Sequence, residues 1–169
     1  MRFKQPSVQD AESLLSFFIR LVGEDSERVE RSEDVSLLTQ SMEEAWVGQL
    51  IEKEHDGEGI AICVLDESSA IVGLGEVERR SRWIERHVAE IRFGLLPGYH
   101  AQGVALIELL QQRARGIDIE VLYYFHLATQ RQGIEVVRSC GFEYSGSIPD
   151  YYKKEGIYIS REFYSKRIG

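Results

Sequence analysis

The stretch that decides the fold is residues 89–115, which begin Ala89-Glu90-Ile91-Arg92-Phe93-Gly94-Leu95-Leu96-Pro97-Gly98-Tyr99-His100-Ala101-Gln102-Gly103-Val104-Ala105. Its first half is mostly apolar, which predicts a strand inside a sheet. Pro97 and Gly98 end that strand, because proline donates no hydrogen bond to a sheet and glycine accepts a tight turn. From Gly103 onward, apolar residues recur at the spacing of an amphipathic helix: Val104, Leu106, Ile107, Leu110 and Ala114.

A strand that leads directly into a helix creates a place where an anion can bind. The first N–H groups of a helix have no partner within it, and they point toward one spot at the positive end of the helix dipole. The glycine-containing turn before this helix therefore predicts a site for an anion such as a pyrophosphate. An ordinary connection with nothing bound is the alternative that these residues leave open.

Composition narrows the class of protein. A chain of 169 residues, 43% hydrophobic and 28% charged, is expected to form one domain over residues 1–169. A net charge of -8 argues against nucleic acid as a partner, because phosphates are bound mainly by Lys and Arg. Cys63 and Cys140 form no CxxC pair, which favours a reducing cytoplasm. No run approaches the ~18 apolar residues that span a bilayer, so we expect a cytoplasmic protein and no membrane partner.

The N-terminal half is predicted to begin with a strand at residues 2–4 and a helix that ends near Gly23. The acidic segment 24–34 is expected to be irregular. A capping box, Ser41 to Glu44, opens a second helix that ends near residue 54. The apolar residues expected on that helix are Ala45, Trp46, Leu50 and Ile51. Strands at 60–65 and 71–78 then form an antiparallel hairpin, followed by a charged connection over residues 79–86.

The C-terminal half adds a strand at residues 119–127 and a helix at 131–140. Gly141 and Phe142 predict that this helix ends in a Schellman motif. A strand at 142–147, a turn at 148–156 and a strand at 158–167 complete the chain. The order β-α-α-β-β-β-α-β-α-β-β predicts an α/β (α+β) fold, with a mixed central sheet of about seven strands flanked by about four helices.

Two motifs, at the expected separation, resemble those of a known family. Residues 90–105 are similar to the acetyl-CoA-binding motif of the GNAT superfamily of N-acetyltransferases, written as Arg or Gln, two variable residues, Gly, one variable residue, and Gly or Ala. Gly103 and Ala105 fit its end, and Gln102 is common in the loop. The second motif of the family, typically Asn-x-x-Ala-Ile-x-Leu-Tyr-x-x-x-Gly-Phe, resembles Gln130-Arg131-Gln132-Gly133-Ile134-Glu135-Val136-Val137-Arg138-Ser139-Cys140-Gly141-Phe142. A closing turn at residues 151–158 also matches, so the resemblance covers essentially the whole chain.

The resemblance implies the GNAT fold and an acetyl-CoA site. The backbone of Phe93, Gly94, Leu95 and Leu96 would pair with the pantetheine arm of the cofactor. The turn and first helical residues would bind the pyrophosphate through backbone N–H groups, in agreement with the anion site derived above; they are His100, Ala101, Gln102, Gly103, Val104 and Ala105. The second motif adds Gln130, Gly133 and Val137 to the expected cofactor-binding residues.

The implied reaction is direct attack of a primary amine on the thioester, without a covalent enzyme intermediate. By resemblance, Glu90 is the candidate base and acts through water; partial burial would raise the pKa of its carboxyl, as a base near neutrality requires. A structural ion pair of Glu90 with Arg92, Arg86 or His87 is the alternative. Val137 stands where a tyrosine often protonates the leaving thiolate. Tyr151 and Ser139 are available for this role, or water assists, but our candidate acids are Tyr144 and Tyr152.

The sequence leaves the acceptor and the physiological role open. A small amine, such as an amino acid or a polyamine, is favoured over a protein amine, because the fold uses up the whole domain. Carboxylates of segment 24–34 could attract a cationic amine. The four histidines do not fall at metal-ligand spacings, so no metal is predicted. A homodimer is left open. The alternative function is a catalytically silent acyl-CoA-binding or regulatory protein, which Val137 favours.

Overall fold

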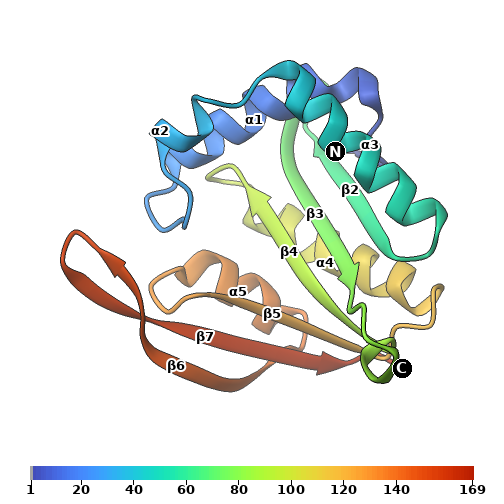
Figure 1. Cartoon of the computed structure of the whole chain (residues 1–169), viewed down its shortest axis with the longest axis vertical. Helices are drawn as coiled ribbons and strands as arrows, with labels where there is room; N and C mark the ends of the chain where they lie inside the picture. The colour runs from blue at the N-terminus through green and yellow to red at the C-terminus, as the bar shows by residue number, and fades with distance from the viewer. Residues whose placement is uncertain (1) are drawn as a thin grey trace.

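Seven strands form one mixed sheet in the order β1-β2-β3-β4-β5-β7-β6, in a computed structural model that describes residues 2–169 (Figure 1). Neighbouring strands run antiparallel except for β4 and β5, which are parallel. The strands are β1 (Arg2–Lys4), β2 (Gly59–Leu65), β3 (Ile71–Arg79), β4 (Val88–Leu95), β5 (Val121–Leu127), β6 (Glu143–Lys154) and β7 (Ile157–Arg167).

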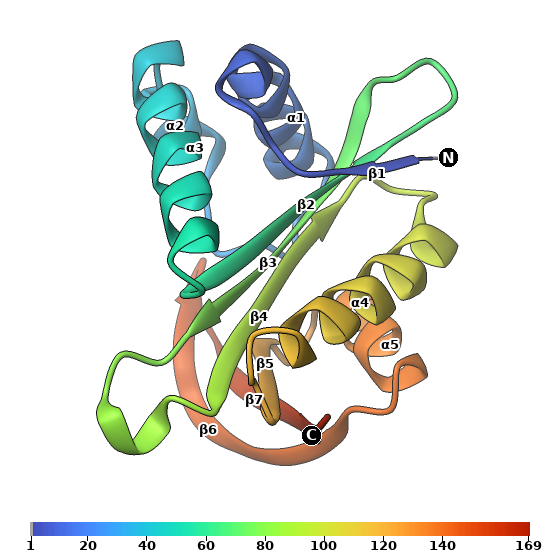
Figure 2. The same cartoon turned by 90° about the vertical axis from the view of Figure 1, so that its right-hand side faces the viewer.

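Helices cover both faces of this sheet. As Figure 2 shows, α1, α2 and α3 lie on one face and α4 and α5 on the other. Their bounds are α1 (Ala11–Glu24), α2 (Ser32–Val35), α3 (Gln40–His55), α4 (His100–Arg115) and α5 (Arg131–Ser139). The predicted fold class and element order are confirmed. The structure adds α2, a single turn that begins at the end of the segment that was expected to be irregular and extends one residue beyond it.

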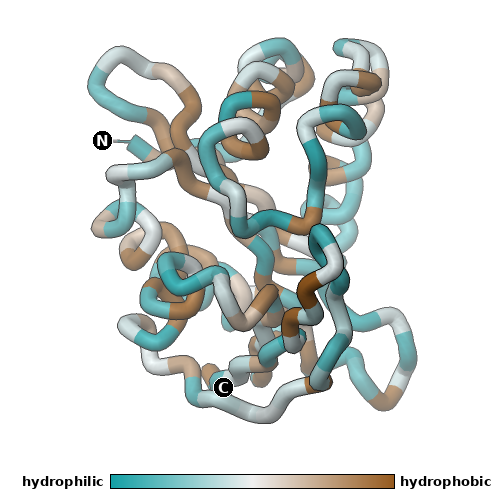
Figure 3. The backbone as a smooth tube through the Cα atoms, turned by 90° about the vertical axis from the view of Figure 1, so that its left-hand side faces the viewer, coloured by the Kyte–Doolittle hydropathy of each residue, from teal (hydrophilic) through white to brown (hydrophobic). Residues whose placement is uncertain are grey.

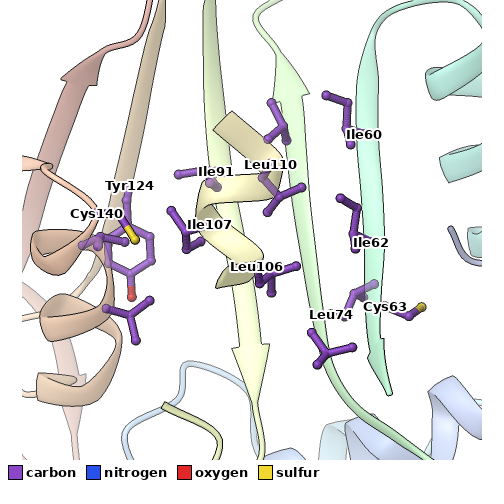
Figure 4. Close-up of a cluster of buried hydrophobic side chains, with 14 of the residues drawn as sticks. Ile60, Ile62, Cys63, Leu74, Ile91, Leu106, Ile107, Leu110, Tyr124 and Cys140 are labelled. Carbon is purple, nitrogen blue, oxygen red and sulfur yellow. The ribbon is translucent and has the colours of Figure 1, made fainter. Parts of the chain in front are cut away.

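One buried hydrophobic cluster extends over both faces of the sheet, and part of it lies between the sheet and α4. Leu106, Ile107 and Leu110 of α4 lie over Ile91 of β4 and are fully buried (Figure 4). Burying each such side chain contributes about 1.5–3 kcal/mol. A Cβ on Gly75 of β3 would stand 2.7 Å from Leu110 Cδ1, so this glycine lets α4 rest directly on the strand. Hydrophobic positions recur along the strands and helices, and hydrophilic ones occupy much of the connections (Figure 3).

The predicted turn over residues 148–156 is wrong. Strand β6 continues to Lys154, and the tight turn is confined to Glu155 and Gly156, which both have positive φ angles of 51° and 84°. The register shifts between Ile148 and Tyr152, so that Pro149 lies in a bulge. Proline is tolerated there because a bulged residue does not have to donate to the neighbouring strand.

The predicted capping box at the start of α3 is also wrong. The helix starts at Gln40, and Thr39 caps it by accepting a hydrogen bond of 3.3 Å from the Met42 N–H. The residues that α3 buries are Glu43, Val47 and Leu50, of which only Leu50 was expected. A buried glutamate is unusual in such a position.

The C-terminal end of α5 follows the sequence closely, whereas the start of α4 differs by one turn. Gly141, with a φ of 82°, ends α5 with the expected Schellman pair of hydrogen bonds, Gly141 N–H to Arg138 and Phe142 N–H to Val137. Helix α4 starts at His100, one turn before the glycine that was expected to open it.

Candidate active site

The central feature of the site is a split in the sheet between β4 and β5. The two strands pair only where Val88–Glu90 face Val121–Tyr123, and then they diverge (Figure 1). The rest of β4 continues to pair with β3, and β5 pairs with β7 over its whole length. The second half of β4 therefore has one edge that β5 does not cover. Such an edge offers N–H and C=O groups to an extended ligand.

A groove occupies this split, and we call it the β4–β5 groove. It brings together seven of the predicted cofactor-binding residues from three parts of the chain: Phe93, Gly94, Leu95, Leu96, His100, Gln130 and Gly133. Tyr124 and His126 of β5 form the opposite wall. The remaining predicted residues of α4, namely Ala101, Gln102, Gly103, Val104 and Ala105, belong to its first two turns and do not line the groove itself.

The packing of Gly103 explains how α4 approaches the groove. A Cβ at this position would stand 2.5 Å from Leu95 Cδ1 and 3.2 Å from Val136 Cγ2. Glycine therefore lets the first turn of α4 press against β4 and α5, which brings the N-terminus of the helix, at His100, to the mouth of the groove. Free N–H groups at this end favour an anion.

Val137 does not line the groove. Its side chain is fully buried in the core, and the adjacent Val136 contributes to the groove wall instead. A valine here offers neither a donor nor an acceptor, so any proton donor in the groove must come from another element.

Tyr124 brings a hydroxyl to the groove. Its ring packs against Phe93 with 5.4 Å between ring centroids, and a Cβ on Gly133 would stand 2.5 Å from the phenol oxygen. The tyrosine thus occupies the space that a larger residue at position 133 would fill. Burial raises the pKa of Tyr124, so the phenol stays protonated. Sequence reasoning missed this residue because it stands within an apolar run that predicts only a buried strand.

His126 is a second polar group on the same wall. Its Nδ1 accepts a hydrogen bond of 2.9 Å from the Leu127 N–H, so the neutral ring carries its proton on Nε2. Burial, assisted by the nearby Arg28 cation, lowers the pKa of His126 to about 4. The imidazole is therefore a neutral donor at physiological pH.

A second hollow, the α1–α3 cavity, adjoins the groove. It has a volume of about 450 Å³ and shares Arg28, Phe93 and Gly94 with the groove, so the two spaces meet at these residues. Most of its wall is apolar and comes from α1, α3, the connection between them, β3 and β4: Leu14, Phe17, Phe18, Leu21, Leu38, Met42, Trp46, Leu74 and Phe93.

Besides Glu30, which is paired with Arg28 at 3.0 Å, two carboxylates interrupt this apolar wall. Glu43 of α3 is only 7% exposed, and within residues 2–169 its carboxylate accepts no hydrogen bond and forms no ion pair. Burial raises the pKa of Glu43, and the charge of Glu76 acts in the same direction. Burial also raises the pKa of Glu76 on β3, although Arg92, with its Nη2 at 3.5 Å, opposes this shift. Neither glutamate was singled out from the sequence.

Glu90, the base predicted from the sequence, lies on the same face of the sheet but outside both hollows. Strand register pairs it with Glu78, two residues along the strands from the Glu76–Arg92 pair. Its carboxylate accepts a hydrogen bond of 3.2 Å from the Tyr123 hydroxyl and lies 3.7 Å from Arg92 Nε. The predicted alternative, an ion pair with Arg92, is thus present.

Tyr144 and Tyr152, the acids predicted from the sequence, both lie on β6 and line neither hollow. Tyr144 is 57% exposed and packs edge-on against Tyr164 with 5.7 Å between ring centroids. The Tyr152 hydroxyl accepts a hydrogen bond of 2.8 Å from Arg161 Nε. The structure therefore does not bring either residue together with the predicted cofactor-binding residues.

Among residues 2–169, no three His, Cys, Asp or Glu side chains gather as a metal site would require. In the same part of the chain, no helix has both the length and the apolar character to cross a bilayer.

Comparison with known proteins relates this architecture to a fold. No family model and no curated protein matches the sequence. An acetyltransferase of the GNAT family from Streptococcus pneumoniae is structurally similar at a TM-score of 0.88 and 19% identity, over 99% of both chains. A ribosomal-protein-alanine N-acetyltransferase from Brucella melitensis is similar at 0.80 and 20%, over 99% of both chains. A phosphinothricin acetyltransferase from Sinorhizobium meliloti, in complex with acetyl-CoA, is similar at 0.81 and 19%, over 99% of this chain and 88% of its own. The chain therefore has the fold of the GNAT acetyltransferases.

Proposed function

We propose that this protein transfers an acetyl group from acetyl-CoA to a primary amine. One observation carries the proposal: the β4–β5 groove and the α1–α3 cavity meet at Phe93 and Gly94, so two ligands could bring their reactive ends together there. A similar solved structure, the phosphinothricin acetyltransferase, is a complex with acetyl-CoA. Both cysteines are free and buried, which agrees with our proposal of a reducing cytoplasm.

The groove suits an extended cofactor. The pantetheine arm would lie along the uncovered edge of β4, from Phe93 to Leu96, and pair with its backbone. The pyrophosphate would bind at the N-terminus of α4, where the helical N–H groups ahead of Gly103 have no partner among residues 2–169 and the helix dipole favours negative charge; the Gly103 N–H itself donates to the Tyr99 carbonyl. Gln130 and Gly133 would form the far wall of this cofactor site.

The reaction must begin with loss of a proton from the ammonium, because only a neutral amine can attack. Glu76 is the carboxylate best supported as the base, since it lines the cavity and burial raises the pKa of its carboxyl. Glu90 remains the alternative, acting through water from beyond Arg92. The neutral nitrogen then attacks the carbonyl carbon and forms a C–N bond, and the C–S bond breaks. The sulfur leaves with the electron pair and takes up a proton, and the nitrogen loses its second proton, finally to solvent, to give the amide.

Tyr124 is the donor best supported for the leaving sulfur. Its hydroxyl belongs to the groove wall, and the raised pKa keeps its proton available for a hydrogen bond. Tyr144 and Tyr152, which the resemblance suggested, have less support because they line neither hollow.

The proposal is tested with two measurements on the intact protein. Acetyl-CoA should raise the melting temperature, and a panel of primary amines should release free thiol from acetyl-CoA. Absence of both effects would contradict acetyl-CoA binding altogether. A thermal shift without thiol release for any amine would favour the second candidate, a catalytically silent acyl-CoA-binding protein, which the buried Val137 at the usual tyrosine position supports.

A further inference from the structure

The side chain of Glu43 is almost wholly buried, yet its carboxylate has no hydrogen-bond or ion-pair partner among residues 2–169. Because no fully enclosed side-chain oxygen of these residues is unpaired, this carboxylate is open to the α1–α3 cavity. Nearly all buried polar groups in proteins are hydrogen-bonded, and an unpaired buried carboxylate costs stability. Whatever fills this cavity can supply the missing donor.

The charges around the cavity indicate the sign of that ligand. Arg28 is paired with Glu30 at 3.0 Å, and Arg92 is paired with Glu78 at 2.7 Å and with Glu76 at 3.5 Å. Both guanidinium groups near the cavity are thus already neutralised, whereas Glu43 is not. A cation is therefore favoured, and an anionic group such as a free carboxylate would have to displace an existing ion pair.

The remaining wall indicates the body of the ligand. Apart from the charged residues, the cavity is lined by aliphatic and aromatic side chains, including Phe17, Phe18 and Trp46. Its volume of about 450 Å³ falls within the range of small-molecule sites. The other two glutamates of the wall, Glu30 and Glu76, are paired with Arg28 and Arg92, so a second cation, as in a polyamine, would meet an apolar wall or have to displace an arginine.

We propose that the acceptor is a small primary amine with an apolar alkyl or aryl body, and that Glu43 binds its ammonium group. This inference rests on the proposed acetyl transfer and specifies its substrate class. Glu43 holds the cation in the cavity, and Glu76 is left to accept its proton. The amino acids and polyamines considered from the sequence are disfavoured, the first by their carboxylate and the second by their additional charge.

Binding can be measured without catalysis through Trp46, which lines the cavity. The protein has two tryptophans, so Trp83→Phe leaves Trp46 as the sole tryptophan, which can be excited selectively over the tyrosines. In this background the probes are hexylamine and phenethylamine, compared with hexanol, hexanoate and diaminohexane. Hexylamine should bind at least ~10-fold more tightly than hexanol or hexanoate, as expected for a buried charge-assisted hydrogen bond.

Matched variants assign the effect to one carboxylate. Glu43→Gln should reduce hexylamine affinity by at least ~10-fold and abolish the preference over hexanol. Glu52→Gln is the control, because Glu52 is an exposed glutamate of the same helix and does not line the cavity. The acetyl-CoA-induced thermal shift should be the same in both variants, which verifies folding.

Several outcomes would overturn this inference: hexanol binding as tightly as hexylamine, an unchanged hexylamine affinity in Glu43→Gln, or no response of Trp46 and of the melting temperature to any apolar amine. Thiol release with polyamines or peptide N-termini, but not with apolar amines, would keep the acetyl transfer and reject the substrate class. Tight amine binding without thiol release would reject the transfer and keep the ammonium site.

Discussion

The β4–β5 groove and the α1–α3 cavity meet at Phe93 and Gly94, yet different parts of the chain form their walls, the backbone in one and side chains in the other. The groove depends on backbone: a strand edge that β5 does not cover, a helix N-terminus, and glycines that allow close approach. The cavity depends on side chains from α1, α3, β3 and β4. A backbone site tolerates replacement of its side chains, whereas one substitution in the cavity can change what it binds. We therefore expect the cofactor to be set by the fold and the acceptor by the sequence.

The largest expected effect separates binding in the groove from chemistry in the cavity. Glu76→Gln should lower turnover by about 10²–10⁴-fold, the usual contribution of a general base, and leave acetyl-CoA binding unchanged. The base must be ionised, and burial raises the pKa of Glu76. As the pH is lowered, wild-type activity should therefore be lost at a higher pH than the usual pKa of a glutamate would give. Steady-state kinetics across pH measure both effects.

Glu90→Gln provides the matched comparison for that experiment. Glu90 lies outside the cavity, so its loss should lower turnover by less than Glu76→Gln does and should preserve the acidic limb of the pH profile. The reverse ranking would assign the base to Glu90 and would show that the cavity carboxylate has another role.

A double-mutant cycle tests the contact between Tyr124 and Gly133 in the groove. Gly133→Ala should destabilise the protein by about 1–3 kcal/mol, because the new methyl group would overlap the phenol oxygen. In the Tyr124→Phe background the same change should be neutral, or stabilising by up to about 1 kcal/mol, since alanine favours a helix over glycine. Urea unfolding measures the four free energies. Equal destabilisation in both backgrounds would disprove the contact.

A smaller effect concerns the stability of the cavity without ligand. Burial raises the pKa of Glu43, so the folded state binds its proton more tightly than the unfolded state, and stability falls as the pH rises through this interval. Glu43→Gln avoids this loss. Its melting temperature should exceed that of the wild type by about 2–4 °C near neutral pH, and the difference should vanish in acid. A difference that persists in acid would point to packing instead of charge.

The smallest effect is expected outside both hollows. Trp83 is 85% exposed and lines neither of them. Trp83→Phe should change the free energy of unfolding by less than about 0.5 kcal/mol. A calorimetric comparison with the wild type should also give identical acetyl-CoA binding, whereas a change would connect this distant loop to the groove.

The contrast between the groove and the cavity also determines how much of each could be predicted from the sequence. The strands, the hairpin of β2 and β3 and the end of α5 follow from local patterns, because turn residues and periodicity act over a few positions. The groove residues Phe93 to Leu96 could be predicted because strand, turn and helix are consecutive in the chain. The extent of their burial and the divergence of β4 from β5 could not be predicted, since both depend on elements that are distant in the sequence.

The cavity could not be predicted for physical reasons. The sequence predicts Ser41 as the N-cap of α3, whereas Thr39 is the residue that caps it. With the helix start misplaced, Glu43 was taken as part of the capping box and not as a residue that faces the sheet. Glu76 stands in a strand of alternating character, where a glutamate is normally solvated. Only the packing of α1 and α3 over β3 and β4 brings the two carboxylates to one cavity.

The split sheet has a consequence for how this molecule avoids aggregation. Exposed strand edges usually invite pairing with other chains, and proteins protect them with charges or short strands. Here the uncovered edge of β4 lies inside the sheet, between two strands that are joined at one end. Another protein's strand would have to enter this wedge from its open end, whereas a thin, flexible ligand can lie along it. The wedge thus excludes bulky partners sterically. The unpaired backbone groups of β4 stay available to a thin ligand but not to the strands of neighbouring proteins.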